Sequence, residues 1–366
     1  MKVALVHDWL IHMRGGEKVL EAIAELYPDA TIYTLFYRRE ELSPVLAGMK
    51  IKASFLQRVP GIFRIYRWLL PLFPLAVALF KLREDLDLVI SISHCAAKAV
   101  HVPRGALHVC YCNTPMRYAW GFEQDYFGKF AVWVRPFLRL TMAAFRRWDR
   151  ISSRGVDHFI ANSKNVQQRI QKYYGREAVV LHPPLNQEAF APDGDLQNYY
   201  LVVSAFVPYK RVDIVIEAFN TMDQELRIVG HGPLERYYRT LVRRNHISFL
   251  GAVTPARLRK LYSGARALIF PTDEDFGIVP LEAQASGTPV IALGRGGALE
   301  SVRHGIFFDA QTPEAVREAV ARFESMSWDR ARIPESVASF AKENFQTAFK
   351  SILASWAGER LSHAAC

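Results

Sequence analysis

The chain has 366 residues, of which 50% are hydrophobic and 22% are charged. This length predicts two domains, and the composition supplies enough apolar surface for folded cores, so an intrinsically disordered protein is excluded. Four cysteines are too few for a disulfide-stabilised scaffold. Cys110 and Cys112 lack a second Cys/His pair at the spacing of a zinc site, so no metal is expected.

The net charge of +10 comes from the N-terminal half of the chain. Residues 1–186 contain 26 basic and 15 acidic side chains, whereas residues 187–366 contain 20 and 21. A basic half of this kind favours an anionic partner, such as membrane lipid, nucleic acid or a phosphorylated substrate. The alternative is a basic surface that serves solubility alone.

Buried strands and amphipathic helices alternate through the N-terminal half. We expect strands at residues 2–6, 86–91, 107–112 and 158–161, and helices at 17–27 and 166–174. The start of the chain lacks the long hydrophobic region and cleavage site of a signal peptide. The longest apolar run, residues 68–80, is too short to span a bilayer and contains two prolines. These features predict a cytoplasmic protein without a transmembrane helix.

A second series of strands and helices follows residues 182–197, a segment rich in Pro, Gly and polar residues that reads as a linker. Strands are expected at 199–204, 226–229, 248–250, 267–271 and 289–293, a helix at 212–219, and an amphipathic helical tail at 333–361. The predicted fold class is α/β, with two doubly wound parallel sheets that face a central cleft. The domains would be residues 1–186 and 187–339, with a C-terminal helix, 340–366, that packs back on the first.

Residues 271–290 form the most informative constellation. A predicted strand ends at Pro271, a loop with Gly277 follows, and a helix is expected to begin near Pro280. Backbone amides at such a helix start bind phosphate, and the carboxylates of Glu274 and Glu282 suit the vicinal hydroxyls of a sugar or ribose. The alternative is that both glutamates only compensate the helix dipole.

The ordered set of motifs resembles the retaining glycosyltransferases of family 4, which have the GT-B fold of two Rossmann-like domains. The resemblance rests on the E-x7-E pattern of residues 274–282 within EDFGIVPLEAQASGTPVIALGRGGALE, and on VPYKR at 207–211, GHGP at 230–233 and FLG at 249–251. It continues through GGE at 15–17, Ser93-His94, TPMRYAW at 114–120 and FIANS at 159–163. The subgroup it resembles builds bacterial lipopolysaccharide or exopolysaccharide, and many of its members are mannosyltransferases.

The resemblance implies catalytic roles for Glu274, Lys210 and His94. Glu274 would contact hydroxyls of the transferred hexose, Lys210 would pair with the donor diphosphate, and His94 would lie beside the donor sugar. Each has a structural alternative: Lys210 as a solvated loop lysine, and His94 as a packing histidine.

Further donor contacts are implied for the remaining motif residues. Glu282 would hold the ribose, backbone groups at Gly277 and Ile278 would bind phosphate, and Val253 would border the base. Gly15 and Gly16 would let the backbone approach donor phosphate, unless they only form a tight turn before the first helix. The nucleotide sugar is then a substrate, and no cofactor is expected.

The sequence departs from the family pattern at two positions. Many family members have an Arg that binds the diphosphate together with the Lys. This chain has Ala205 at that position, so Arg211 would supply the second charge. Asn113 stands where the subgroup often has His, and it can still hydrogen-bond a hydroxyl. Asp8, Asn113 and Arg117 are weaker candidates for the acceptor side of the site.

The resemblance implies hexose transfer with retention at the anomeric carbon, with mannose from GDP-mannose as the preferred donor. The leaving phosphate would help to deprotonate the acceptor, and no metal is expected. Two alternatives remain: a nucleotide-sugar epimerase of the same fold, and a non-catalytic protein that binds nucleotide sugars.

Two basic segments account for the charge of the N-terminal half. Residues 50–83 contain seven Lys/Arg and no acid, and residues 129–154 contain seven Lys/Arg and only Asp149. Basic and apolar faces side by side predict contact with the anionic cytoplasmic face of the inner membrane, which would suit a polyprenyl-diphosphate-linked acceptor. The alternative is a core-facing helix with a solvated basic face, and no nucleic-acid-binding motif is present. The candidate membrane residues are Arg64, Arg67, Trp68, Arg135, Arg139 and Arg146.

Overall fold

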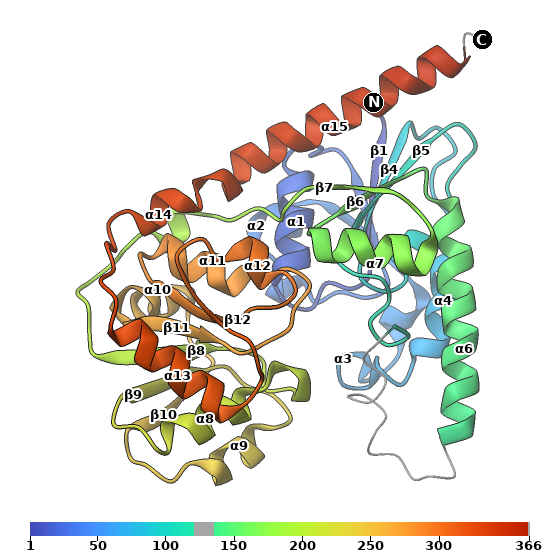
Figure 1. Ribbon diagram of the computed structural model, residues 1–366. Helices are drawn as coiled ribbons and strands as arrows, with labels where there is room; N and C mark the ends of the chain where they lie inside the picture. Colours follow the sequence, from blue (N-terminus) through green and yellow to red (C-terminus); the bar gives the residue numbers. More distant parts are fainter. Residues whose placement is uncertain (121–134, 365–366) are drawn as a thin grey trace. The chain divides into compact units, whose positions relative to one another are not determined.

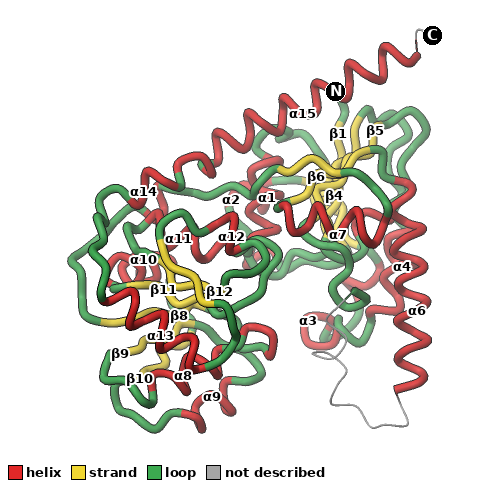
Figure 2. The backbone as a smooth tube through the Cα atoms, viewed as in Figure 1, coloured by secondary structure: helices red, strands yellow, loops and turns green. Residues whose placement is uncertain are grey.

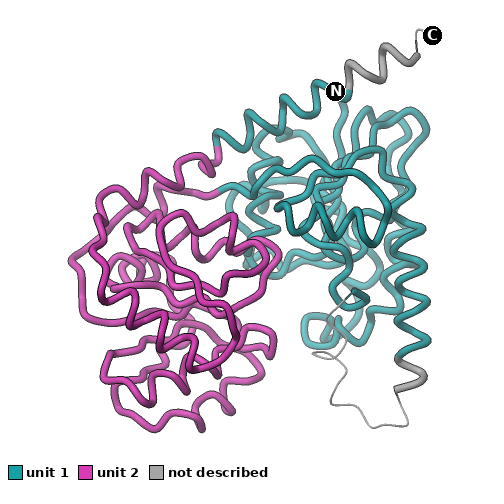
Figure 3. Tube along the Cα trace, in the orientation of Figure 1, with its two compact units in different colours: residues 1–184, 343–366 teal, residues 185–342 magenta. Residues whose placement is uncertain are grey.

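The computed structural model describes residues 1–120 and 135–364. It divides into two compact units (Figure 3). Unit 1 contains residues 1–184 and 343–366, and unit 2 contains residues 185–342. Figures 1 and 2 show that each unit is built around a parallel sheet with helices packed on it.

The sheet of unit 1 has seven parallel strands in the order β3-β2-β1-β4-β5-β6-β7. Its central strands are buried along their whole length, as expected for a parallel sheet covered on both faces. The strands are β1 (Val3–His7), β2 (Thr31–Thr34), β3 (Lys50–Ala53), β4 (Leu88–Ser93), β5 (Leu107–Cys112), β6 (His158–Ala161) and β7 (Ala178–Val180).

Helices cover both faces of this sheet. On one face pack α1 (Gly15–Ala24), α2 (Pro44–Gly48) and α15 (Lys342–Ala364), which supply Leu20, Leu46 and Phe349 to a common core. The opposite face is covered by α3 (Ile62–Ile65), α4 (Phe73–Ala78), α6 (Arg135–Ser152) and α7 (Lys164–Tyr174). The chain therefore returns to unit 1 at its C-terminal helix, where the Trp356 and His158 rings stack at 4.3 Å.

Unit 2 has a six-stranded parallel sheet in the order β10-β9-β8-β11-β12-β13. The strands are β8 (Tyr199–Val203), β9 (Glu225–Val229), β10 (Ile247–Gly251), β11 (Ala267–Phe270), β12 (Val290–Leu293) and β13 (Gly305–Phe308). Two cores fill its faces, one beneath α8 (Val212–Phe219), α9 (Glu235–Leu241) and α13 (Pro313–Glu324), the other beneath α10 (Pro255–Gly264) and α11 (Ile278–Ala285). The smaller helices are α12 (Ala298–Ser301) and α14 (Ile333–Ser336).

The α/β fold of two Rossmann-like parallel sheets is confirmed. The strands expected at 107–112 and 158–161 have those same bounds, and the other expected strands differ by a few residues. Ser163 caps α7, since its hydroxyl accepts the Val166 amide. Four short strands, β2, β3, β7 and β13, were not predicted.

Helix α11 begins at Ile278, so Pro280 lies in its first turn as the sequence predicts. Two other local predictions were wrong. The tail is not one helix, because the chain between α14 and α15 leaves the helical conformation and Phe340 O accepts the Leu185 amide at 2.7 Å. Most of the expected linker packs as part of unit 2, where Leu185 and Phe190 are buried.

Candidate functional site

Lys210 and Glu274 form an ion pair at the carboxyl end of the unit 2 sheet. Lys210 ends the short 3-10 helix η8 (Pro208–Lys210) that follows β8, and Glu274 lies in the loop between β11 and α11. The Lys210 residue is only 9% exposed, and its ammonium lies over the ring of Phe270 at 5.9 Å. The ammonium is thus held at the point where ligands of such sheets bind.

Two glycines after β9 support the backbone that leads to Lys210. A Cβ atom on Gly230 would lie 1.8 Å from Ser204 O, and one on Gly232 would lie 2.6 Å from Phe206 O. The Phe206 amide donates to His231 O at 3.0 Å, which ties the two loops together. Any side chain at either glycine would displace the connection between β8 and η8.

A second glycine pair supports the loop that carries Glu274. The Gly297 amide donates to Glu274 O at 2.8 Å. A Cβ on Gly297 would lie 2.1 Å from Phe276 Cα, and one on Gly296 would lie 2.4 Å from Glu274 O. The Gly294-Arg295-Gly296-Gly297 segment therefore packs directly against the Glu274–Phe276 backbone.

The start of α11 directly follows this loop. Gly277 is its N-cap residue, with φ of +86°, and Ile278 is the first helical residue. A helix N-terminus presents unpaired amides and a positive dipole end, which suits a phosphate group. The prediction that Gly277 and Ile278 contribute backbone groups to phosphate is compatible with this geometry.

Glu282 lies one turn into α11 and is 6% exposed. Its Oε2 accepts the Tyr262 hydroxyl of α10 at 3.0 Å. Burial, together with the Glu282 carboxylate, raises the pKa of Tyr262 well above its ordinary value, so the phenol stays protonated and donates. Tyr262 thereby fixes the orientation of the Glu282 carboxylate.

Arg211 has the left-handed conformation, with φ of +49°. Its Nε donates to Asp213 Oδ2 at 3.2 Å, so part of the guanidinium is bound within unit 2. Asp213 lies in the first turn of α8. Val253 is partly buried after β10.

In unit 1, Asp8 follows β1 and is fully buried. Its carboxylate accepts the four backbone amides of residues 94–97, at distances from 2.5 to 2.9 Å. Burial acts to raise the pKa of the Asp8 carboxyl, but the His94 ring and the amide donors outweigh it and hold that pKa below its ordinary value. Asp8 is thus engaged on both oxygens by the His94–Ala97 turn.

His94 Nδ1 lies 3.1 Å from Asp8 Oδ2, and the Trp9 ring packs edge-on at 4.4 Å. Burial lowers the pKa of His94, and the cations Arg117, Lys98 and Arg14 lower it further, while Asp8 raises it. The neutral ring then donates Nδ1–H to Asp8 and keeps an Nε2 lone pair that can accept from a hydroxyl.

Gly16, His7 and Asn113 come together at the start of α1. A Cβ on Gly16 would lie 3.0 Å from Asn113 Nδ2 and 3.5 Å from His7 Nε2. Both nitrogens are buried without a hydrogen-bond partner among the described residues. His7 Nδ1 lies 3.0 Å from Trp9 O and must donate to it, so Nε2 of the neutral ring is an acceptor. Gly15 has open space around its Cα.

Most candidate membrane residues lie on the helices of unit 1. Arg64, Arg67 and Trp68 are exposed on and after α3, and Arg139 is exposed on α6. Arg146 is partly buried and donates to Ala119 O at 3.3 Å. The Arg135 side chain lies outside the described residues.

Metal-binding clusters and membrane-spanning helices are both absent from the described residues. Within residues 1–120 and 135–364, no group of three or more His, Cys, Asp or Glu side chains could hold a metal ion. Over the same ranges, no helix is both long enough and apolar enough to cross a membrane.

Several supporting residues were missed from the sequence. Tyr262, Gly296 and Gly297 orient the two glutamates, and Lys98 and Asp149 form a buried pair behind His94. A lone tyrosine on a helix gives no signal in a single sequence. The paired glycines do give one, because closely spaced glycines after a strand indicate backbone contact.

Two sequence models of known families match consecutive parts of the chain. The model of Glycosyltransferase Family 4 matches residues 14–188, and that of Glycosyl transferases group 1 matches residues 184–340. Together they span the elements that carry all of the motifs described above.

Three curated relatives are 26% to 29% identical to the chain over the residues that match. An uncharacterized glycosyltransferase of Methanocaldococcus jannaschii, MJ1178, is 28% identical over 205 residues, 54% of this chain and 58% of that protein. The O-antigen chain mannosyltransferase RfbU of Salmonella typhimurium is 26% identical over 242 residues, 62% and 67% of the two chains. A GDP-mannose-dependent phosphatidylinositol monomannoside mannosyltransferase of Mycobacterium tuberculosis is 29% identical over 201 residues, 46% and 52%. The matches therefore span about half to two thirds of these relatives.

Solved structures share the fold over nearly the whole chain. HepE of Anabaena, solved in complex with UDP, gives a TM-score of 0.72 at 18% identity and covers 97% of this chain and 100% of its own. Sucrose-phosphate synthase of Thermosynechococcus elongatus gives 0.74 at 17% identity, with 98% and 100% covered. This likeness and the paired Rossmann-like sheets show that the chain has the GT-B fold. The two family models, which together span residues 14–340, show that it belongs to glycosyltransferase family 4.

Proposed function

We propose that the chain is a retaining hexosyltransferase that transfers mannose from GDP-mannose to a lipid-linked saccharide during synthesis of a bacterial surface polysaccharide. The observation that carries the donor part is the Lys210–Glu274 pair, held by loops that glycines support, with Glu274 in the loop that leads into α11. Two mannosyltransferases among the relatives support the choice of sugar.

The chemistry follows from the charges that develop in the reaction. As the nucleotide diphosphate leaves, negative charge grows on its oxygens, and the Lys210 ammonium and the amides of α11 stabilise it. Donor binding would release Glu274 from Lys210, so that its carboxylate accepts hexose hydroxyls. Glu282, oriented by Tyr262, would accept the ribose hydroxyls.

The site is tested by substitutions that keep side-chain size. Glu274→Gln and Lys210→Met should each lower kcat/KM by about 100-fold or more, the usual effect of losing one preorganised electrostatic contact. Glu217→Gln and Lys260→Met, which change exposed charges of unit 2, are matched controls and should leave turnover unchanged. Full transfer by either site variant would contradict the proposed roles.

The donor is identified by calorimetry with GDP, UDP, ADP and their hexose conjugates. We expect GDP and GDP-mannose to bind most tightly. Tighter binding of UDP conjugates would identify a UDP-sugar as the donor instead, and the proposal that the chain is a transferase would stand. Conversion of a free nucleotide sugar without acceptor would instead favour an epimerase, and tight binding without any turnover would favour a non-catalytic protein.

Retention is tested separately by NMR of the first product formed. The one-bond coupling between the anomeric carbon and its proton should match that of the donor, since the H1–H2 coupling of mannose is small in both anomers. An inverted product would exclude the proposed mechanism, in which the leaving phosphate and the acceptor share one face of the sugar.

The membrane part of the proposal rests on a surface of unit 1 that we call the α3–α4 surface. Large apolar side chains recur there at intervals of three or four residues and face solvent, Trp68 at 73% exposure and Leu79 at 57%. Arg64, Arg67 and Lys81 are exposed among them. The apolar members are Ile65, Trp68, Leu72, Leu75 and Leu79.

This combination suits an anionic bilayer. Apolar side chains enter the acyl boundary, and each nearby cation adds about 1 kcal/mol of attraction to anionic lipid. The protein should float with phosphatidylcholine–phosphatidylglycerol vesicles and less with phosphatidylcholine alone. Trp68→Ala should weaken flotation, whereas Leu299→Ala, which truncates an exposed leucine of unit 2, should not. Flotation that depends on neither lipid charge nor Trp68 would contradict the proposal that the α3–α4 surface binds the membrane.

A further inference from the structure

A buried ion pair lies directly behind the His94 turn. Lys98 belongs to the 3-10 helix η4 (Ala97–Ala99), and Asp149 belongs to α6. Their side chains are 2% and 0% exposed. The Lys98 ammonium also donates to Cys95 O at 3.1 Å, so it touches both α6 and the backbone next to His94.

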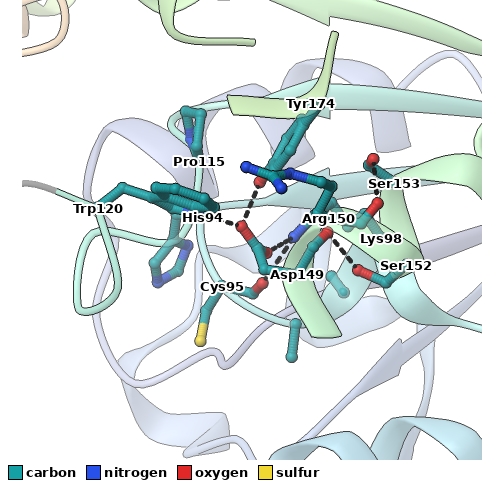
Figure 4. A network of polar contacts seen from close by, with 12 residues as sticks. His94, Cys95, Lys98, Pro115, Trp120, Asp149, Arg150, Ser152, Ser153 and Tyr174 are labelled. Carbon is teal, nitrogen blue, oxygen red and sulfur yellow. Dashed lines mark hydrogen bonds and ion pairs between the residues drawn. The ribbon is translucent and has the colours of Figure 1, made fainter. Parts of the chain in front are cut away.

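The Asp149 carboxylate connects α6 to several other segments of unit 1, as Figure 4 shows. Its carboxylate accepts Trp120 Nε1–H at 2.7 Å and the Tyr174 hydroxyl of α7 at 2.8 Å, in addition to the Lys98 ammonium. Burial acts to lower the pKa of Lys98, but Asp149 outweighs it and raises that pKa, so the Lys98 ammonium stays charged. A buried network in which both carboxylate oxygens of Asp149 accept hydrogen bonds has a defined geometry.

The His94–Ala97 turn is therefore held from two sides. Asp8 binds its four amides and His94 Nδ1, and Lys98 binds the Cys95 carbonyl. Asp8 fixes the direction of the amides, while Lys98 fixes the carbonyl of Cys95, the residue that follows His94. Loss of either support leaves the imidazole with an alternative orientation.

We propose that Lys98 and Asp149 are positioning residues for His94 and that they couple α6 to the transfer site. The inference rests on the proposed function, because His94 acts on the donor sugar only if the chain is a transferase. Without this role, the pair is an ordinary buried ion pair whose only effect is on folding.

The two interpretations differ in the double variant Lys98→Met/Asp149→Asn. Each single change leaves one buried charge unpaired and should destabilise unit 1 strongly. The double change removes both charges, so the melting temperature should largely recover. Under the positioning role, kcat of the double variant should stay at least about tenfold below that of the unmodified protein, with KM for the donor changed less.

The titration of His94 gives a second readout. The charged or titratable groups around its ring are Asp8, His7, Arg14, Arg117 and Lys98. Since Lys98 lowers the pKa of His94, the double variant should titrate His94 at higher pH and move the acid limb of the kcat/KM profile upward.

Two further variants complete the experiment. Tyr174→Phe removes one donor to Asp149 without touching the His94 turn, and it should move the His94 titration in NMR even if the double variant folds poorly. Tyr111→Phe removes a buried hydrogen bond to Leu181 O elsewhere in unit 1 and should leave kcat and the His94 titration unchanged.

The outcomes separate the two ideas. Wild-type kcat and an unmoved His94 titration in the double variant and in Tyr174→Phe would overturn the positioning role. The NMR titration needs no substrate. An unmodified chain without transfer activity would therefore overturn the proposed function alone.

Discussion

Gly297→Ala should separate packing from catalysis in unit 2. The added Cβ would lie 2.1 Å from Phe276 Cα and 2.5 Å from Phe276 N, and both atoms belong to backbone that cannot rotate away. Ordinary van der Waals contact begins at 3.4 Å, so the loop must move by about 1.3 Å. The same loop carries Glu274, whose carbonyl accepts the Gly297 amide.

A displacement of this size has a large expected effect on turnover. Misplacing a contact by about 1 Å costs about 100-fold in rate, so kcat/KM should fall by that factor. Overpacking should also cost about 1–3 kcal/mol of folding free energy. Donor turnover and urea unfolding of the same preparation measure both effects.

Gly294→Ala is the matched control, because the same segment offers a position with room. Its Cβ would lie 3.4 Å from Phe307 Cβ, an ordinary contact. We expect near wild-type turnover and a stability change within about 1 kcal/mol. If Gly297→Ala kept wild-type kcat/KM, or if both alanines behaved alike, the claim that Gly297 sets the position of Glu274 would be refuted.

Three further predictions concern single buried groups. Burial lowers the pKa of His108 from 6.5 to about 4. Between these pH values the unfolded chain binds a proton at His108 and the folded chain does not. The free energy of unfolding should therefore fall by about 3 kcal/mol as pH falls from 6.5 toward 4. Urea unfolding at several pH values should show this slope, and His108→Gln should flatten it. Tyr262→Phe removes the donor that orients Glu282 and should raise the Kd of the nucleotide about threefold to tenfold in calorimetry. Asp8→Asn places an amide among four backbone donors and should destabilise the fold by about 3 kcal/mol or more and abolish turnover, as thermal melts and assays would show.

The sequence predicted most of the sheet framework because buried parallel strands are continuous apolar runs, as in residues 107–112. It missed β3, β7 and β13, short strands in which most residues are exposed or half-buried. Periodicity cannot distinguish such short runs from loops. The break near Phe340 was missed because its cause, Leu185, lies far away in the chain.

The site shows the same division between local and distant information. The positions of Glu274, Lys210 and Gly277 beyond strand ends could be predicted, since each lies within a recognisable motif. The hydrogen-bond partners of Asp8 and Asp149 could not be predicted. The amides that bind Asp8 lie more than 80 residues away, and Lys98 is 51 residues from Asp149. Only the folded chain shows that Asp8 holds a turn in place, with no oxygen left unengaged for an acceptor.

The buried pair also changes the charge argument for the basic segment 129–154. Its one acid, Asp149, is fully buried and neutralised by Lys98, which lies outside the segment. The segment therefore has no surface acid that offsets those of its described cations that face solvent. They are Arg139, Arg147, Arg150 and Arg154. Arg150 Nε donates to Tyr173 O, so part of its guanidinium is already hydrogen-bonded within the protein. These cations would add to the attraction to anionic lipid that we propose for the α3–α4 surface. Arg139, Arg147 and Arg150 lie on α6, the helix that the buried pair connects to His94.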